Sequence, residues 1–228
     1  MSSTRFNIFN QIHKGLRAML YELALEIQQT DFSDVEAAGA IVKEVEQVVS
    51  FFTAHAEHED RFILPAVAKH NARLIEAFAH DHLEDGWLAG LLLKSVEAWR
   101  AAAGALARVQ AGTELFYHFT EFTAFNLVHM NKEERFLNEV LWQYYTDSEI
   151  LDLERRILAS IPPGILAVES RWMMKGMSNP EIIAWLRGVK QAAPEALFLS
   201  LLALAEEALP EGRWKRVRAV LVDGVMVA

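Results

Sequence analysis

Hydrophobic side chains recur every three or four residues through most of the first 160 positions, and this spacing predicts a series of amphipathic α-helices. We expect a first helix over residues 4–29 and a second from Ser33 to about Pro65. A third should run from about Asn71 to the glycine-containing stretch 104–112, and a fourth from Thr113 to about residue 145. A fifth helix is expected over residues 146–160. The sequences Ser33–Glu36 and 146–149 both have the pattern of a capping box.

Four long helices joined by short polar connections indicate an all-α fold, an antiparallel up-down-up-down four-helix bundle over residues 1–160. After Gly164 the pattern changes to short helices separated by Pro180, Pro194 and Pro210. Residues 165–228 are therefore predicted to be a helical C-terminal extension, which packs on the bundle or at a subunit interface.

A polar motif occurs twice within these helices, as His55-x-x-x-Glu59 and His129-x-x-x-Glu133, each followed by an acid, Arg, Phe and an aliphatic residue. Residues four apart on a helix differ by about 40° around the axis and about 6 Å along it, so each motif projects an imidazole and a carboxylate from one face.

The apolar residues around each motif predict that this face points inward. Three precede the first motif and three precede the second at helical spacing, and Phe62 and Phe136 continue the two stripes: Val45, Val48, Phe52, Phe119, Phe122 and Phe125. An unpaired carboxylate in such a stripe would cost several kcal/mol. A multivalent cation is the simplest partner for it.

Two further histidines are predicted to face the same interior. His13 is the only polar member of the stripe on the first helix. On the third helix, His82 follows Leu74, Ile75 and Phe78 at helical spacing, whereas His80, which forms a third His-x-x-x-Glu pair with Glu84, follows the polar residues Arg73 and Glu76. We therefore select His82 and keep His80 as the alternative.

The remaining candidates are assigned other positions. His118 shares a helix face with His129 but lies about 16 Å away along the axis, and we expect a hydrogen-bonded core residue there. Asp60 and Glu134 are expected to support the ligands or to lie at the surface, and Glu134 is kept as an alternative to Glu133.

Composition excludes several classes of function. The net charge is −9 and the basic residues are dispersed, which argues against nucleic-acid or anionic-membrane partners. The chain has no cysteine, so disulfides, iron–sulfur clusters, thiolate zinc sites and cysteine nucleophiles are excluded. The N-terminus has no leader pattern and the longest apolar stretch, residues 196–205, is short, so we expect a cytoplasmic protein.

Four histidines and two glutamates drawn from four helices make a dinuclear metal site. Carboxylates can bridge ions about 3.5–4 Å apart. Imidazole with carboxylate suits iron, with zinc or manganese as substitutes. If each glutamate bridges and each ion takes two imidazoles, positions stay open for dioxygen, peroxide or nitric oxide.

The order single His, His-x-x-x-Glu, single His, His-x-x-x-Glu resembles the hemerythrin-like, or HHE cation-binding, family over about residues 4–160, as does the run from Glu59 to Pro65. The resemblance implies a non-haem di-iron centre, oxo- or hydroxo-bridged, with Glu59 and Glu133 as bridges. It also implies four terminal ligands: His13, His55, His82 and His129. Oxygen carriers of the family have a second histidine where this chain has Phe78, and the repair proteins have a cysteine-containing N-terminal region that this chain lacks.

These features support a metal-binding protein that senses dioxygen, nitric oxide or redox state, with its helical tail or a homo-oligomer formed through that tail as the output. The alternative is a di-iron enzyme that reduces peroxide or nitric oxide, or that donates iron for iron–sulfur cluster repair. A third hypothesis is a single structural zinc or no metal at all. The paired carboxylates argue against the third hypothesis, but the sequence does not separate sensor from enzyme.

Overall fold

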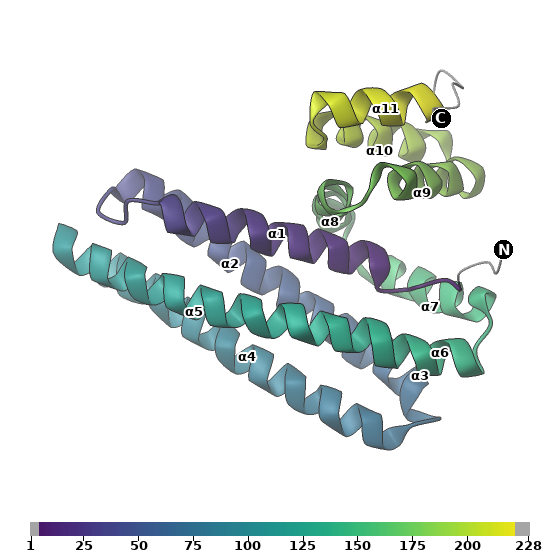
Figure 1. Cartoon of the computed structure of the whole chain (residues 1–228), viewed down its shortest axis with the longest axis horizontal. Helices are drawn as coiled ribbons and strands as arrows, with labels where there is room; N and C mark the ends of the chain where they lie inside the picture. Colours follow the sequence, from purple (N-terminus) through teal and green to yellow (C-terminus); the bar gives the residue numbers. More distant parts are fainter. Residues whose placement is uncertain (1–4, 222–228) are drawn as a thin grey trace. The chain divides into compact units, whose positions relative to one another are not determined.

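The computed structural model describes residues 5–221, and this part of the chain is helical with short connections and no β-strand (Figure 1). The elements of its first part are α1 (Asn10–Gln29), α2 (Val35–His58), the π-helical turn η1 (Glu59–Ile63), α3 (Leu64–Ala68), α4 (Ala72–Ala101), α5 (Ala105–Lys132), the π-helical turn η2 (Glu133–Leu137) and α6 (Asn138–Tyr144). Those of its second part are α7 (Asp147–Ser160), α8 (Pro163–Gly176), α9 (Asn179–Ala192), α10 (Glu195–Ala208) and α11 (Glu211–Leu221).

The described residues fall into two compact units. One contains the residues up to Phe9 and Met19–Ser160; the other contains Asn10–Ala18 and the residues from Ile161 onward. We call these the first and the second unit. The first half of helix α1 therefore belongs to the second unit, and its second half belongs to the first unit. Within residues 5–221 no helix combines the length and the apolar character needed to cross a lipid bilayer.

In the first unit, the long helices α2, α4 and α5 lie side by side (Figure 1). Their facing stripes are aliphatic and aromatic, and the rings of Phe52 on α2 and Phe122 on α5 meet edge to face with centroids 5.2 Å apart. At one end, a second apolar cluster gathers α3, α6 and α7 around Val67, Leu141 and Ile150. There the Tyr145 hydroxyl donates a hydrogen bond to the Ala66 carbonyl at 2.9 Å.

Gly104 forms the turn between α4 and α5 with a φ of 89°, a conformation that side chains with a Cβ rarely adopt. The connection between α1 and α2 packs against these helices, because Trp99 Nε1 donates to the Phe32 carbonyl at 3.1 Å. A Cβ at Gly112 would lie 2.1 Å from the Phe32 side chain. A glycine is therefore needed where this aromatic ring crosses α5.

Several predicted helix boundaries are wrong. Helix α1 begins at Asn10 rather than near residue 4. Ser33 does not cap α2, because its amide and hydroxyl both donate to Asp31, and Asp34 is the cap instead. Thr113 lies inside α5, where its hydroxyl donates to the Val109 carbonyl. The stretch 105–112 is rich in alanine and continues the helix across its single glycine.

Other predicted boundaries are confirmed. Asn71 caps α4, accepting a hydrogen bond from the Leu74 amide at 3.1 Å. Thr146 and Glu149 form the predicted capping box at the start of α7. Each of these sites combines a short polar side chain with a helix that begins directly after it, which is the pattern that sequence can show.

In the second unit, α8 to α11 surround an apolar core that includes Met174, Ile182, Leu186, Ala205 and Val217. Ser178 and Glu181 form a capping box at the start of α9.

The first half of α1 packs closely in this second unit. A Cβ at Gly176 would lie 2.0 Å from the Lys14 carbonyl oxygen, so α8 and α1 are in backbone contact there. Glu181 accepts hydrogen bonds from Lys14 and, at 3.1 Å, from Asn10.

Candidate metal centre

Each copy of the repeated motif pairs its imidazole with its own carboxylate. His55 Nε2 lies 3.1 Å from Glu59 Oε1, and His129 Nε2 lies 3.0 Å from Glu133 Oε1. Both carboxylates are buried, with exposed fractions of 3% for Glu59 and 0% for Glu133. The motif therefore directs two negative charges into the protein, as the position of these residues in an apolar stripe predicted.

Both glutamates are the first residue of a π-helical turn, η1 or η2. Such a turn closes i→i+5 hydrogen bonds, so the residues beyond it reach the buried face one position later than on an α-helix. The prediction that Phe136 continues the buried stripe is wrong, because Phe136 is 48% exposed and Leu137 is fully buried. In η1 the residue after Phe62, Ile63, is likewise the buried one. π-Turns inside helices occur frequently at functional sites.

Helix α4 brings His82, not His80, to the two carboxylates. His82 Nε2 lies 3.5 Å from Glu59 Oε2 and 3.9 Å from Glu133 Oε1, whereas His80 and Glu84 are exposed. This buried nitrogen has no hydrogen-bond partner among the described residues. This nitrogen therefore lies between the two carboxylates, where it could serve as a metal ligand.

These residues form two overlapping clusters of donor atoms. Single donor atoms of Glu59, His82, His129 and Glu133 all lie within 4.8 Å of one another, and so do those of His55, Glu59 and Glu133. Imidazole nitrogens with carboxylate oxygens are the donors that iron, manganese and zinc accept. The donor set and its burial therefore fit a metal of this class.

His13 lies on α1 and is fully buried. It belongs to the segment Asn10–Ala18, which is part of the second unit. Its participation in the cluster of the first unit stays a prediction.

Two aspartates contact the Nδ1 atoms of the imidazoles, on the side of each ring away from the glutamates. Asp60 Oδ1 lies 2.8 Å from His82 Nδ1, and Asp81 Oδ2 lies 3.2 Å from His129 Nδ1. A carboxylate that accepts a hydrogen bond from Nδ1–H leaves the Nε2 lone pair available for a metal. This is the usual arrangement around metal-bound histidine. The sequence indicated a supporting or surface position for Asp60, but it gave no sign of Asp81.

The carboxylates shift the acid–base properties of the histidines. Burial lowers the pKa of His82, but the nearby carboxylates of Glu133, Glu59 and Asp60 outweigh burial and raise that pKa to about 11. The pKa of His129 is also raised, since Glu133 and the other nearby acids outweigh its burial. In the metal-free protein His82 is therefore protonated and balances buried negative charge, and a metal must displace its proton.

A second buried polar pair lies one helical turn beyond this cluster. Asn126 Nδ2 donates to Asp85 Oδ1 at 2.6 Å, and both side chains are buried. Burial raises the pKa of Asp85, although Asn126 opposes this shift. The pattern of apolar residues in the sequence did not predict this pair.

His118 occupies a different position. Its Nδ1 lies 2.7 Å from the Ser95 hydroxyl, which confirms the prediction of a hydrogen-bonded residue outside the metal cluster.

Comparison with known families identifies one matching family model, described as the hemerythrin HHE cation-binding domain, over residues 4–143. This range contains all six of the predicted ligands. Neither the curated proteins nor the solved structures gave a match.

Proposed function

Because the chain belongs to the hemerythrin HHE cation-binding family, we propose that its buried His–Glu cluster is a non-haem di-iron centre. We further propose that the helices carrying it form an up-down-up-down four-helix bundle with residues 165–228 as an extension. The proposed ligands are His13, His55, Glu59, His82, His129 and Glu133.

One observation carries this proposal. The two donor clusters share both carboxylates, Glu59 and Glu133, and differ in their imidazoles. Two shared carboxylates between two sets of imidazoles is the arrangement that a pair of carboxylate-bridged ions requires. A mononuclear zinc site would need only one of these clusters.

In this proposal each ion takes two of the four imidazoles, and His13 is the fourth. His13 is buried on the same helical stripe as Leu16, Leu20 and Leu23, and it is the only histidine of that stripe. Its backbone is continuous with the half of α1 that belongs to the first unit.

The bound ions would supply open coordination positions for a small ligand. The protein's own groups would have three tasks. Glu59 and Glu133 would hold the ions, Asp60 and Asp81 would fix the tautomers of His82 and His129, and the surrounding side chains would exclude water. We propose that the centre senses dioxygen, nitric oxide or redox state.

A di-iron enzyme is the second candidate, and the Asp85–Asn126 pair favours it. A buried carboxyl with a raised pKa, one turn from His82, would be placed to supply protons for the reduction of peroxide or nitric oxide. Iron donation for cluster repair belongs to the same alternative. Multiple turnovers with peroxide or nitric oxide at a useful rate would decide for the enzyme.

We propose a diatomic gas or peroxide as the small-molecule partner. We also propose that the protein forms a homo-oligomer through its C-terminal helices and is located in the cytoplasm. We propose no nucleic-acid or membrane partner.

The centre is tested by metal analysis and ultraviolet–visible spectra of the full chain purified after iron supplementation. Wild type should hold two iron ions and show oxo-bridge absorption, and Glu59→Ala or Glu133→Ala should abolish this dinuclear loading because each removes a bridge. Glu84→Ala and His118→Ala are the matched controls and should keep both ions. Equal iron loss in Glu84→Ala, or two ions in Glu133→Ala, would contradict the assignment.

A further inference from the structure

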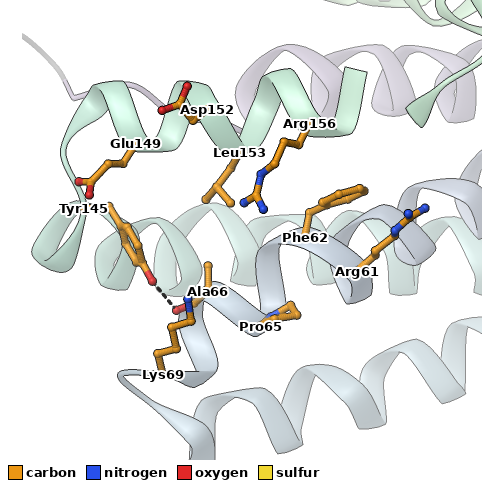
Figure 2. A pocket seen from close by; sticks show the side chains of 10 residues that line it. All are labelled: Arg61, Phe62, Pro65, Ala66, Lys69, Tyr145, Glu149, Asp152, Leu153 and Arg156. Carbon is orange, nitrogen blue, oxygen red and sulfur yellow. Dashed lines mark hydrogen bonds between the residues drawn. The ribbon is translucent and has the colours of Figure 1, made fainter. Parts of the chain in front are cut away.

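A hollow of about 290 Å³ lies between η1–α3 and α7 (Figure 2). Apolar and aromatic side chains form much of its wall: Phe62, Pro65, Ala66, Tyr145 and Leu153. No proposed metal ligand lines it, although Arg61 and Phe62 belong to the same π-turn as Glu59. Its volume is at the lower end of the range for small-molecule pockets and suits a compound with one ring.

Arg156 projects its guanidinium into the middle of this hollow (Figure 2). The guanidinium carbon lies 6.0 Å from the centroid of the Phe62 ring, and that of Arg61 lies 5.0 Å from the same ring. Lys69 adds a third cation to the lining. The Phe62 ring therefore lies near two guanidinium groups, in a wall that combines apolar and charged side chains.

The two acids of the lining do not neutralise Arg156. Asp152, one helical turn before it, pairs instead with Arg155 at 2.7 Å, and Glu149 accepts hydrogen bonds from the Thr146 amide and hydroxyl. Both carboxylates point away from the centre of the hollow in Figure 2.

All three lining cations lack an acidic partner. Within residues 5–221, the side chains of Arg156, Arg61 and Lys69 form no ion pair and no hydrogen bond. The hollow thus combines an apolar surface with unbalanced positive charge.

We propose that this hollow binds a small organic carboxylate with an apolar, ring-sized body. The carboxylate would accept two parallel hydrogen bonds from the Arg156 guanidinium, the geometry in which arginine binds such groups most strongly. The body of the ligand would rest on Phe62, Pro65 and Leu153 and remove apolar surface from water. Inorganic anions offer only the charge, so they should bind more weakly.

The test is calorimetric titration of the metal-loaded full chain with benzoate, with inorganic phosphate and benzyl alcohol as comparison probes. Benzoate should bind saturably, phosphate more weakly, and neutral benzyl alcohol not measurably. Arg156→Gln should weaken benzoate binding by about tenfold or more, because it removes the charged, two-pronged donor.

Arg135→Gln is the matched control. Arg135 is the residue of η2 that corresponds to Arg61 in the repeat, it is exposed, and it does not line the hollow, so the variant changes net charge equally and should bind benzoate as wild type does. Absence of saturable benzoate binding, equal affinity for phosphate, or equal weakening in both variants would overturn the proposal. Iron content is measured separately, so failure here is distinguishable from failure of the di-iron assignment.

Discussion

The histidines of the metal cluster are oriented by acids on neighbouring helical segments. Asp60 on η1 holds His82 on α4, and Asp81 on α4 holds His129 on α5. Asp81 is in turn held by Lys132 at 2.8 Å. The direction of each imidazole therefore depends on the packing between segments, and a change in one supporting acid should reach the metal without removing a ligand.

Replacing Asp81 by Asn should lower metal affinity by about 10- to 100-fold, because the amide fixes the His129 tautomer less strongly and lowers the basicity of Nε2. Chelator competition with zinc or iron measures the change. Glu76→Gln is the control, since Glu76 is exposed on the same helix, and it should bind metal as wild type does. Unchanged affinity in Asp81→Asn would show that the 3.2 Å contact has no effect on the metal.

Metal loading should release protons. The pKa of His82 in the metal-free protein is about 11, above its ordinary value of 6.5, so its imidazolium stabilises the fold fully below about pH 6.5 and this contribution is lost as the pH rises through about 11. At pH 8 the imidazole is still protonated, and a metal must take its place. Zinc added to metal-free protein in weak buffer at pH 8 should therefore acidify the solution, and no pH change would contradict the shift.

At the scale of single residues, the sequence predicts the positions that lie on an apolar stripe and misses those beside it. His82, Glu59 and Glu133 interrupt stripes of hydrophobic residues, and periodicity detects such interruptions. Asp81 directly precedes His82 and faces a different helix, so its partner His129 follows only from helix packing. Asp85 was missed for the same reason, since Asn126 belongs to α5.

At the scale of the helices, the two π-turns are the main feature that the sequence could not predict. Both copies of the repeat form one, starting at Glu59 and at Glu133. An i→i+5 turn contains the same residue types as an i→i+4 turn, so composition does not distinguish them. The consequence is the exchange of buried positions from Phe62 and Phe136 to the aliphatic residues that follow them.

This exchange predicts effects of different size for truncations at neighbouring positions. Leu137→Ala should lower the free energy of unfolding by about 2–5 kcal/mol, because the side chain is fully buried. Phe136→Ala should cost less than about 1 kcal/mol, although the side chain is larger, because it is 48% exposed. Urea denaturation of both variants measures the difference. A larger loss in Phe136→Ala would indicate a regular α-helix at this position.

At the scale of the whole molecule, α1 is the element that both compact units share. Its first half carries His13 and is held in the second unit by Glu181, which also closes the capping box of α9. The backbone contact at Gly176 leaves no room for a side chain at that position. The sequence identified the tail as helical, but only the structure shows that Glu181 binds α1.

Glu181 gives the second unit a defined dependence on pH. Burial raises the pKa of Glu181, but hydrogen bonds from Lys14, Ser178 and Asn10 outweigh it and lower the pKa to about 2, from an ordinary value of 4.5. A carboxyl group with a lowered pKa stabilises the folded state at pH values above its ordinary pKa of 4.5. This contribution is lost as the pH falls from about 4.5 towards 2. Protonation should therefore loosen α9 and its contact with α1.

Hydrogen exchange of peptides from α8 and α9 in metal-free protein checks this expectation. Glu181→Gln should exchange faster than wild type at pH 5, and the difference should shrink as the pH falls from 4.5 to 3, because the wild-type carboxylate loses its advantage there. Glu195→Gln, at an exposed position in the first turn of α10, is the control and should follow wild type throughout. A difference between Glu181→Gln and wild type that stays constant with pH would mean that Glu181 acts through shape and not through its charge.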